Sequence, residues 1–218
     1  MGYDAVIFDN DGVLLTPTSQ RTHVEGARDA FARVGVTDPH PDHVDAMSIG
    51  VDVAELERVC EAYGLDPSSF WSVRDAAISD AQRSDMTDGE KHPYDDLDAL
   101  AALSTPLGVV SSNQRATVEF AFDHFGLADH FETVHAREPT IESLERKKPA
   151  PHYVEAALAD LGVDDALFVG DNESDVVAAD RAGIDSAFIR RPHRVDAALS
   201  VTPDYEVWGL DDIVDIAG

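Results

Sequence analysis

The chain has 218 residues and a formal net charge of −27, with 43 acidic residues against 16 Lys and Arg. This charge argues against nucleic acids and anionic membranes as partners, since both are themselves negative. No apolar run approaches the roughly 20 residues of a membrane-spanning helix, and no basic segment precedes the first apolar stretch. We therefore expect a cytoplasmic protein without a signal peptide, and the single cysteine, Cys60, excludes an internal disulfide.

The acidic excess also predicts adaptation to a salt-rich cytoplasm. Aspartates are spread along the whole chain, so their mutual repulsion opposes a compact fold in dilute buffer. At about 1 M salt the Debye length falls to roughly 3 Å, and most of this repulsion is screened. The hydrophobic content of 44% is ample for a packed core. We expect a halophilic protein.

The first expected element is a short buried strand at residues 5–8, followed by Asp9-Asn10-Asp11-Gly12. Strand side chains repeat with period two, so Asp9 and Asp11 should leave the same face while Asn10 points away. Two neighbouring carboxylates at the end of a buried strand repel each other, and a cation or a shared proton must hold them together. A solvated acidic turn is the alternative at this point.

Residues 20–82 show only helical patterns. Helices are expected at 24–34, 43–47, 53–63 and from 67 onward, and the polar stretch 84–93 is expected to be a linker. We interpret 16–92 as a helical cap domain inserted into a core domain made of residues 1–15 and 93–218.

Strand and helix patterns alternate after residue 93. Strands are expected at 107–110, 131–134, 166–169, 184–189 and 205–207. Helices are expected at 95–103, 116–125, 152–161, 174–182 and at the C-terminus, with a polar, irregular loop at 137–148. This alternation predicts an α/β fold with a doubly wound parallel sheet covered on both faces.

In such sheets ligands bind beyond the carboxyl ends of the strands. Asp9 and Asp11 follow the first strand, Ser111 follows 107–110, and Lys148 opens a helix. Asp171 and Asp175 follow 166–169.

These residues, in this order, resemble the motifs of the haloacid dehalogenase-like superfamily, in its phosphoglycolate phosphatase and β-phosphoglucomutase-like branch with a helical cap. The resemblance implies that Asp9 is the nucleophile and Asp11 the general acid/base. It makes Ser111 the second-motif hydroxyl, with Ser112 as a rival, and Lys148 the third-motif lysine, with Lys147 as a rival.

The resemblance also implies a Mg²⁺ site. Its ligands would be Asp9, Asp171 and Asp175 together with the backbone carbonyl of Asp11, and Asp175 would act directly, through water or by orienting Lys148. A hard cation would neutralise these carboxylates beside a phosphate. Substrate contacts are expected from Ser112, Asn113 and the cap loop around Gly50.

The expected function is a Mg²⁺-dependent phosphatase acting on a small phosphorylated metabolite, of the phosphoglycolate or sugar phosphate type, through an aspartyl-phosphate. A β-phosphoglucomutase-like mutase is the alternative, with His23 as a candidate cap acid/base. A phospho-acceptor module without turnover is a remote alternative.

The cap loop carries no cation for a substrate carboxylate, and only Arg58 and Arg115 are candidates to reach one. A monomer or weak homodimer is expected.

Overall fold

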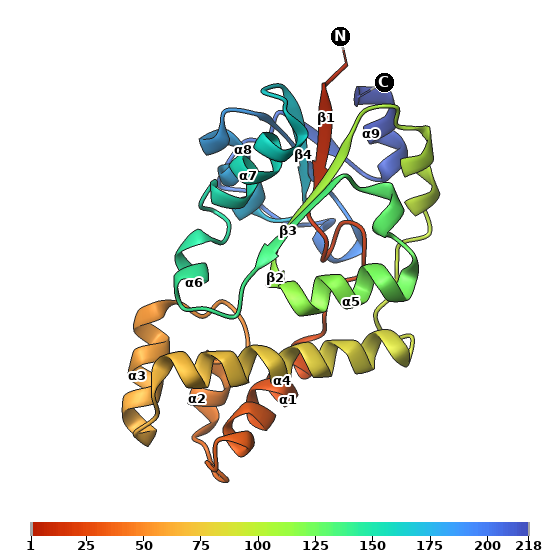
Figure 1. Ribbon diagram of the computed structural model, residues 1–218. Coiled ribbons are helices and arrows are strands. Elements are labelled where there is room, and N and C mark those ends of the chain that lie inside the picture. Colours follow the sequence, from red (N-terminus) through yellow and green to blue (C-terminus); the bar gives the residue numbers. More distant parts are fainter. Residues whose placement is uncertain (1, 218) are drawn as a thin grey trace.

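The computed structural model describes residues 2–217. They form a parallel sheet with helices on both faces, and a separate group of helices lies beyond the carboxyl ends of the strands (Figure 1). The strand order is β3-β2-β1-β4-β5-β6, and every neighbouring pair is parallel. The strands are β1 (Ala5–Phe8), β2 (Leu107–Gln114), β3 (Thr133–Arg137), β4 (Ala166–Gly170), β5 (Asp185–Ile189) and β6 (Tyr205–Val207). The predicted doubly wound α/β fold is confirmed.

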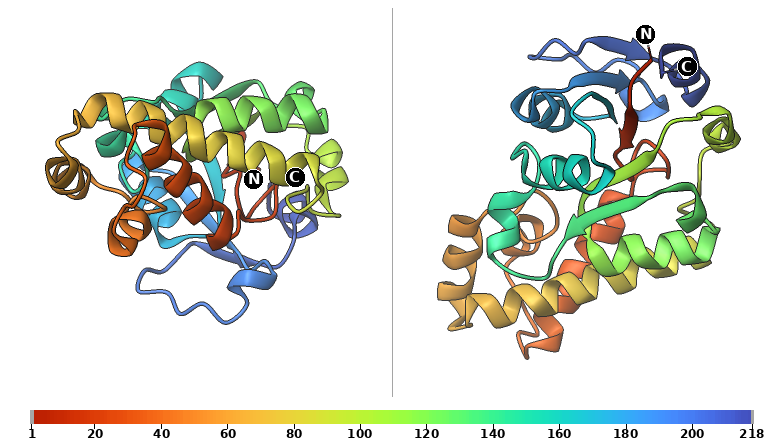
Figure 2. Two further views of the ribbon diagram at one scale, coloured as in Figure 1. Left: turned by 90° about the horizontal axis from the view of Figure 1, so that it is seen from below. Right: turned by 45° about the horizontal axis from the view of Figure 1, so that its top comes forward.

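The two faces of the sheet bury alternate residues of β1, as period-two geometry requires. Val6 and Phe8 pack in one hydrophobic cluster with residues of α5 (Arg115–Phe125), η1 (Leu97–Ala102) and α9 (Leu210–Ala217). Ala5 and Ile7 pack in another with α7 (His152–Leu161) and α8 (Glu173–Ala182). Figure 2 shows the sheet between these helices.

Four helices form the separate group: α1 (Gln20–Arg33), α2 (Pro41–Ala46), α3 (Val53–Tyr63) and α4 (Pro67–Thr87). They share a hydrophobic cluster centred on Phe31, Phe70 and Trp71. Side-chain caps begin α1, α3 and α4, where Ser19, Asp52 and Asp66 each accept a backbone N–H. The division into residues 16–92 and a two-part core remains a prediction.

The predicted bounds of several elements were wrong. The helix expected at 95–103 is the 3₁₀ helix η1, because the Asp96 carboxylate binds Arg191 and the Leu210 N–H instead of capping it. The irregular loop expected at 137–148 contains α6 (Glu142–Arg146), whose Leu144 packs into the α1–α4 cluster.

Other elements are longer or shifted. Strand β2 continues four residues beyond its predicted end, because it pairs with β3 through Ser111 and, after a register shift, Gln114. Strand β3 begins at Thr133 instead of Phe131. Helix α4 runs four residues into the predicted linker. Within residues 2–217, no helix combines the length and the apolar character needed to cross a membrane.

Candidate active site

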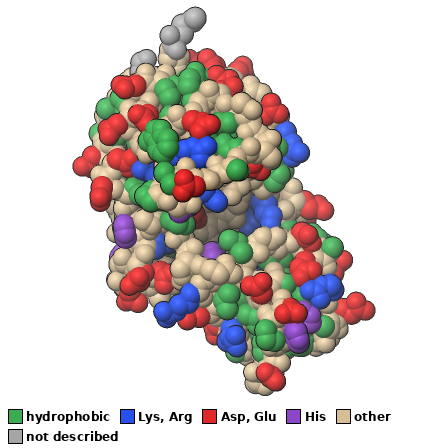
Figure 3. Space-filling model, turned by 180° about the vertical axis from the view of Figure 1, so that it is seen from behind, with side chains coloured by type: hydrophobic (Ala, Val, Ile, Leu, Met, Phe, Trp, Pro, Cys, Tyr) green, Lys and Arg blue, Asp and Glu red, His purple; other side chains and the backbone are tan. Residues whose placement is uncertain are grey.

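A cavity of about 510 Å³ lies between the carboxyl ends of the strands and the α1–α4 helices. The register Phe8↔Val109 and Phe8↔Val169 brings the end of β1 beside the end of β4 and beside the last residues of β2, so these segments open at one place. Asp9, Asp11 and Asp171 line the cavity from this side, and His23 and Gly50 line it from the helical side. Figure 3 shows the hollow between the two parts of the molecule.

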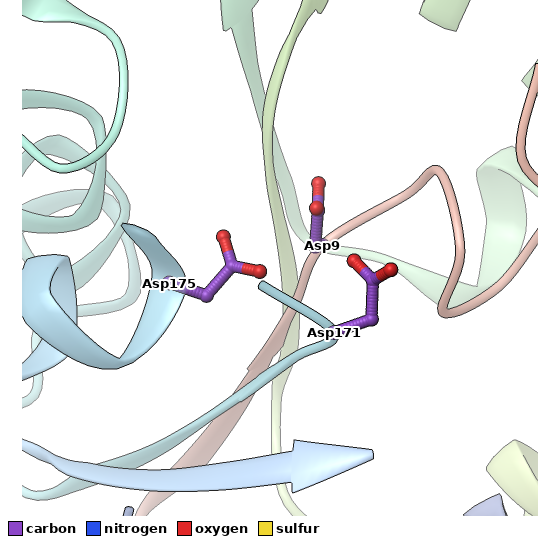
Figure 4. A group of neighbouring side chains, drawn as sticks. All are labelled: Asp9, Asp171 and Asp175. Carbon is purple, nitrogen blue, oxygen red and sulfur yellow. The ribbon is translucent and has the colours of Figure 1, made fainter. Parts of the chain in front are cut away.

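Three aspartates converge at the strand ends (Figure 4). Asp9 follows β1, Asp171 follows β4, and Asp175 lies in the first turn of α8, and each has a carboxylate oxygen within 4.8 Å of one from each other member. Asp175 is fixed by a capping box, in which its Oδ2 accepts the Asn172 N–H at 3.0 Å. The structure thus brings together the three predicted carboxylate ligands.

Lys148 joins two of these aspartates. Its Nζ lies 2.9 Å from Asp9 Oδ1 and 2.7 Å from Asp175 Oδ1, and it donates to the Val110 carbonyl at 3.1 Å. Burial alone would lower the pKa of Lys148, but Asp175 and Asp9 raise it above its ordinary value. Lys148 is therefore a permanent cation between the two acids.

Lys148, together with Arg194, which lies 3.2 Å from Asp171, does not neutralise three buried carboxylates. Burial, together with the charges of Asp175 and Asp171, raises the pKa of Asp9 to about 8 in spite of Lys148. Burial also raises the pKa of Asp175. The cluster keeps an excess of negative charge, and it offers the oxygen donors that Mg²⁺ prefers. These residues fit a hard divalent cation.

Asp11 occupies a different environment. Its carboxylate forms an ion pair with the buried Lys91 Nζ and accepts the Asn113 amide at 2.7 Å. Burial alone would raise the pKa of Asp11, but Lys91 and Asn113 outweigh it and lower the pKa. Gly12 turns the chain here with φ of +84°, and a Cβ at this position would meet Asp171 Oδ2 at 2.5 Å. The turn requires glycine.

The sequence pattern does not predict the ion pair between Lys91 and Asp11, because residue 91 falls in the predicted linker 84–93. Lys91 follows α4, and its Nζ also donates to Thr18 at 2.8 Å. A signal was present, because all three lysines of the chain, Lys91, Lys147 and Lys148, surround this site although arginines outnumber lysines elsewhere.

The second-motif assignment stays a prediction. Ser111 is buried, and its Oγ accepts the Asn113 N–H at 3.1 Å. The neighbouring Ser112 and Asn113 line the cavity, as does Gly50 from the helical side. Ser112 and Asn113 are therefore placed to meet a ligand, whereas Ser111 orients the turn that carries them.

Of the cations considered for the far side of the cavity, neither reaches it. Arg58 pairs with Glu55 at 2.6 Å, and Arg115 with Glu138 at 2.7 Å. Five other cations line the cavity: Lys148 and Arg194 beside the acidic cluster, and Arg74, Arg137 and Lys147 away from it.

Two histidines also line the cavity. Burial, helped by Arg74, lowers the pKa of His23 to about 4, so this imidazole is neutral at pH 7. His193 was not predicted as a site residue, yet its Nε2 lies 2.6 Å from Asp171 Oδ2. Arg194 approaches the same oxygen at 3.2 Å. Both belong to the 3₁₀ turn η3 (Pro192–Arg194), which lies in the connection between β5 and β6.

The chain is similar in sequence to proteins of one hydrolase family. The profile of the family described as haloacid dehalogenase-like hydrolase matches residues 6–189. Pyrophosphatase PpaX of Oceanobacillus iheyensis is 32% identical over 130 residues, and the chain covers only 59% of its length. Pyrophosphatase PpaX of Anoxybacillus flavithermus is 30% identical over 233 aligned positions, which span 100% of this chain and 98% of that protein.

The fold is also that of CbbY from Rhodobacter sphaeroides, solved in complex with phosphate. The TM-score is 0.71 at 18% identity, with 97% of this chain and 96% of CbbY covered.

Proposed function

This chain belongs to the haloacid dehalogenase-like hydrolase family, and we propose that it is a Mg²⁺-dependent phosphatase that hydrolyses a small phosphorylated metabolite through an aspartyl-phosphate. The observation that carries this proposal is the contrast between the two carboxylates that follow β1. Asp9 lies in the acidic cluster beside Lys148, and Asp11 lies outside it, paired with Lys91 and Asn113. This contrast supports the assignment of attack to Asp9 and of proton transfer to Asp11.

Lys91 and Asn113 favour the ionised form of Asp11, so Asp11 takes up a proton from water before the first step. The ionised Asp9 then attacks the phosphorus, the bond from phosphorus to the ester oxygen breaks, and this leaving oxygen takes the proton from Asp11. In the second step Asp11 removes a proton from water, which attacks the phosphorus of the aspartyl-phosphate and releases phosphate. Covalent catalysis divides one difficult displacement into two easier ones. The positively charged Lys148 lies 2.9 Å from the attacking carboxylate and stabilises the charge on the phosphoryl oxygens.

Asp9, Asp171 and Asp175 would hold the Mg²⁺, with the backbone carbonyl of Asp11. When bound, the ion supplies charge neutralisation for the carboxylates and the phosphoryl oxygens. Ser112 and Asn113 line the same cavity, and we expect Ser112 to donate a hydrogen bond to the substrate phosphate. The Asn113 amide donates to Asp11 and Gln82, so its part is to hold Asp11.

Phosphate release from a panel of phosphate esters and pyrophosphate, with Mg²⁺ at molar KCl, tests this proposal. The names of the curated relatives make pyrophosphate a substrate to include. We expect release with at least one small ester, and loss of activity in Asp9→Asn by a factor of about 10³ or more. Full activity of Asp9→Asn would refute the nucleophile. Isomerisation of a sugar phosphate without phosphate release would support a mutase instead.

A further inference from the structure

The side of the cavity that faces the α2–α3 loop is positively charged, in a chain that is otherwise strongly acidic. Arg74, Arg137 and Lys147 line it, whereas the lining carboxylates are Asp9, Asp11, Asp171 and Asp175, which all belong to the catalytic side. We call the first three residues, with the loop 47–51 that Arg74 and Lys147 contact, the distal cluster. In the whole chain the acidic residues outnumber Lys and Arg by 43 to 16, so a local excess of cations sets the distal cluster apart from the rest of the molecule.

Lys147 and Lys148 are consecutive, but their side chains serve opposite sides of the cavity. Lys148 contacts Asp9, Asp175 and the Val110 carbonyl at the strand ends. Lys147 donates to the Val51 carbonyl at 2.6 Å, in the loop of the helical group. An ammonium group has three N–H donors, and Val51 is its single acceptor among residues 2–217. Two donors of Lys147 are therefore left for a ligand.

The two arginines supply charge and rigidity. Arg74 Nε and Nη2 donate to the carbonyls of Met47 and Ser48, at 2.8 and 2.6 Å, and so fix the loop. Arg137 binds Asp75 through two parallel hydrogen bonds of 2.7 and 2.8 Å, and Asp75 also meets Arg74 at 3.1 Å. One carboxylate thus serves two guanidinium groups, and the distal cluster keeps a positive excess.

Two further observations point to an anion here. Burial lowers the pKa of Lys147, and repulsion from Arg137 and Arg74 lowers it further, although Asp52 and Asp75 oppose this. Both guanidinium groups lie over the ring of Trp71, each 4.8 Å from its centre, and Trp71 lines the cavity. Its buried indole N–H has no hydrogen-bond partner within residues 2–217. The distal cluster therefore holds three cations and an unpaired N–H donor, and an anion would supply the acceptors that they lack.

We infer that Lys147, supported by the charges of Arg74 and Arg137, binds a second anionic group of the substrate, so that the substrate is a phosphate ester carrying a carboxylate or a further phosphate. The inference rests on the proposed function, since it concerns the other end of the same cavity. A volume of about 510 Å³ accommodates a small molecule with two such ends. Lys147 is then a specificity-determining residue.

Binding of phosphonates tests the inference without turnover. Methylphosphonate carries one anionic end, phosphonoacetate adds a carboxylate, and methylenebisphosphonate adds a second phosphonate. Their Kd values are measured by the fluorescence of Trp71, in a Trp208→Phe background and at a fixed free Mg²⁺ concentration. Trp208 is the only other tryptophan. We expect at least one two-ended ligand to bind about 10- to 100-fold more tightly than methylphosphonate, as a charge-assisted contact predicts.

Lys147→Gln should remove most of this difference, and Lys147→Arg should retain it. Arg146→Gln is the matched control, because Arg146 carries the same charge one position earlier but is exposed and not part of the cavity. Thermal unfolding of each variant verifies that it is folded. If all three ligands bind equally to the unsubstituted protein, or if Lys147→Gln and Arg146→Gln behave alike, the inference is overturned.

The same variants separate this inference from the proposed function. If phosphate esters are hydrolysed, the ratio of kcat/KM between esters with an anionic tail and esters with a neutral tail should fall in Lys147→Gln and not in Arg146→Gln. If no ester is hydrolysed while phosphonoacetate still binds through Lys147, the proposed function fails and the distal anion site stands. An unchanged ratio would refute the role of Lys147.

Discussion

The ion pair between Lys91 and Asp11 sets the environment of the proposed acid/base. Lys91 is 1% exposed, and its ammonium contacts both the Asp11 carboxylate and Thr18. Removing one member of such a pair leaves the other charge without its partner. We expect Lys91→Met to reduce kcat about 10-fold or more and to lower the free energy of unfolding by about 2–4 kcal/mol.

A double-mutant cycle with Asp11→Asn checks this explanation. If the unpaired Asp11 carboxylate causes the loss of stability, Lys91→Met/Asp11→Asn should be more stable than the sum of the single substitutions predicts. Urea unfolding of the four proteins measures the coupling. Strictly additive values would show that Lys91 does not act through Asp11.

Cys60 offers a simpler test of burial at the level of one residue. The side chain is 1% exposed in the α1–α4 cluster, as its helical pattern predicted. Burial, with a smaller contribution from Asp66, raises the pKa of the Cys60 thiol to about 11. Since the thiolate is the reactive form, iodoacetamide at pH 8 should alkylate the folded protein about 100-fold more slowly than the unfolded chain. Equal rates, followed by mass spectrometry, would contradict the packing of α3.

At the scale of elements, strands and helices were predictable where the hydrophobic pattern of the local sequence matches the face that packs against the core. Residues 152–161 and 205–207 match α7 and β6, because local pattern and tertiary packing agree there. The segment with α6 was not predictable, since its helix depends on Leu144 reaching the hydrophobic cluster of distant helices. The site residues Asp9, Lys148, Asp171 and Asp175, by contrast, were predictable, because they follow the expected strands or open the expected helices.

The site residues that were missed come from segments placed by tertiary structure alone. Lys91 is 80 positions from Asp11, and Asp75 is 62 positions from Arg137. No local spacing connects such pairs. His193 reaches Asp171 from a short turn after β5, whose course the sequence pattern does not define.

The Asp75–Arg137 pair is the strongest tie between α4 and β3. Both side chains are nearly inaccessible, and Arg137 binds the carboxylate through two parallel hydrogen bonds. Arg137→Met should lower the free energy of unfolding by about 3–5 kcal/mol, because a buried carboxylate loses its main partner. Arg115→Met is the control, since the Arg115–Glu138 pair is exposed and should matter by less than about 1 kcal/mol. Similar losses in chemical denaturation would contradict this tie.

Asp96 connects η1 to the C-terminal elements, and its contribution should depend on pH. Its Oδ2 accepts from Arg191 at 2.6 Å and from the Leu210 N–H at 2.9 Å. Burial alone would raise the pKa of Asp96, but these donors lower it below its ordinary value. The stabilisation is therefore complete above the unfolded-state pKa of about 4 and is lost as the pH falls through the lower pKa of the folded state.

We expect Asp96→Asn to cost about 1–3 kcal/mol at pH 7 and progressively less below about pH 4. Urea unfolding of both proteins across this range measures the difference. A cost that stays constant or grows on acidification would show that the carboxylate charge is not what stabilises this junction.

At the scale of the whole molecule, the net charge of −27 is distributed over a surface of 10,077 Å². The acidic excess remains after pairing, since 43 acidic residues face only 16 Lys and Arg. Repulsion between exposed carboxylates is long-ranged at 0.1 M salt, where the Debye length is about 10 Å, and is screened at 1 M, where it is about 3 Å. The folded state should therefore gain stability with salt.

Thermal unfolding in KCl from 0.1 to 2 M tests this adaptation, and the Tm should rise across the range. Charge can be separated from general salt effects at three exposed aspartates, Asp38, Asp88 and Asp129. Changing all three to Asn should raise the Tm at 0.1 M KCl and flatten its salt dependence, because it removes repulsion that salt otherwise screens. Changing the same three to Glu keeps the charge and should preserve the slope. A Tm that is constant or falls with KCl, or equal slopes for the Asn and Glu variants, would show that self-repulsion does not limit this fold.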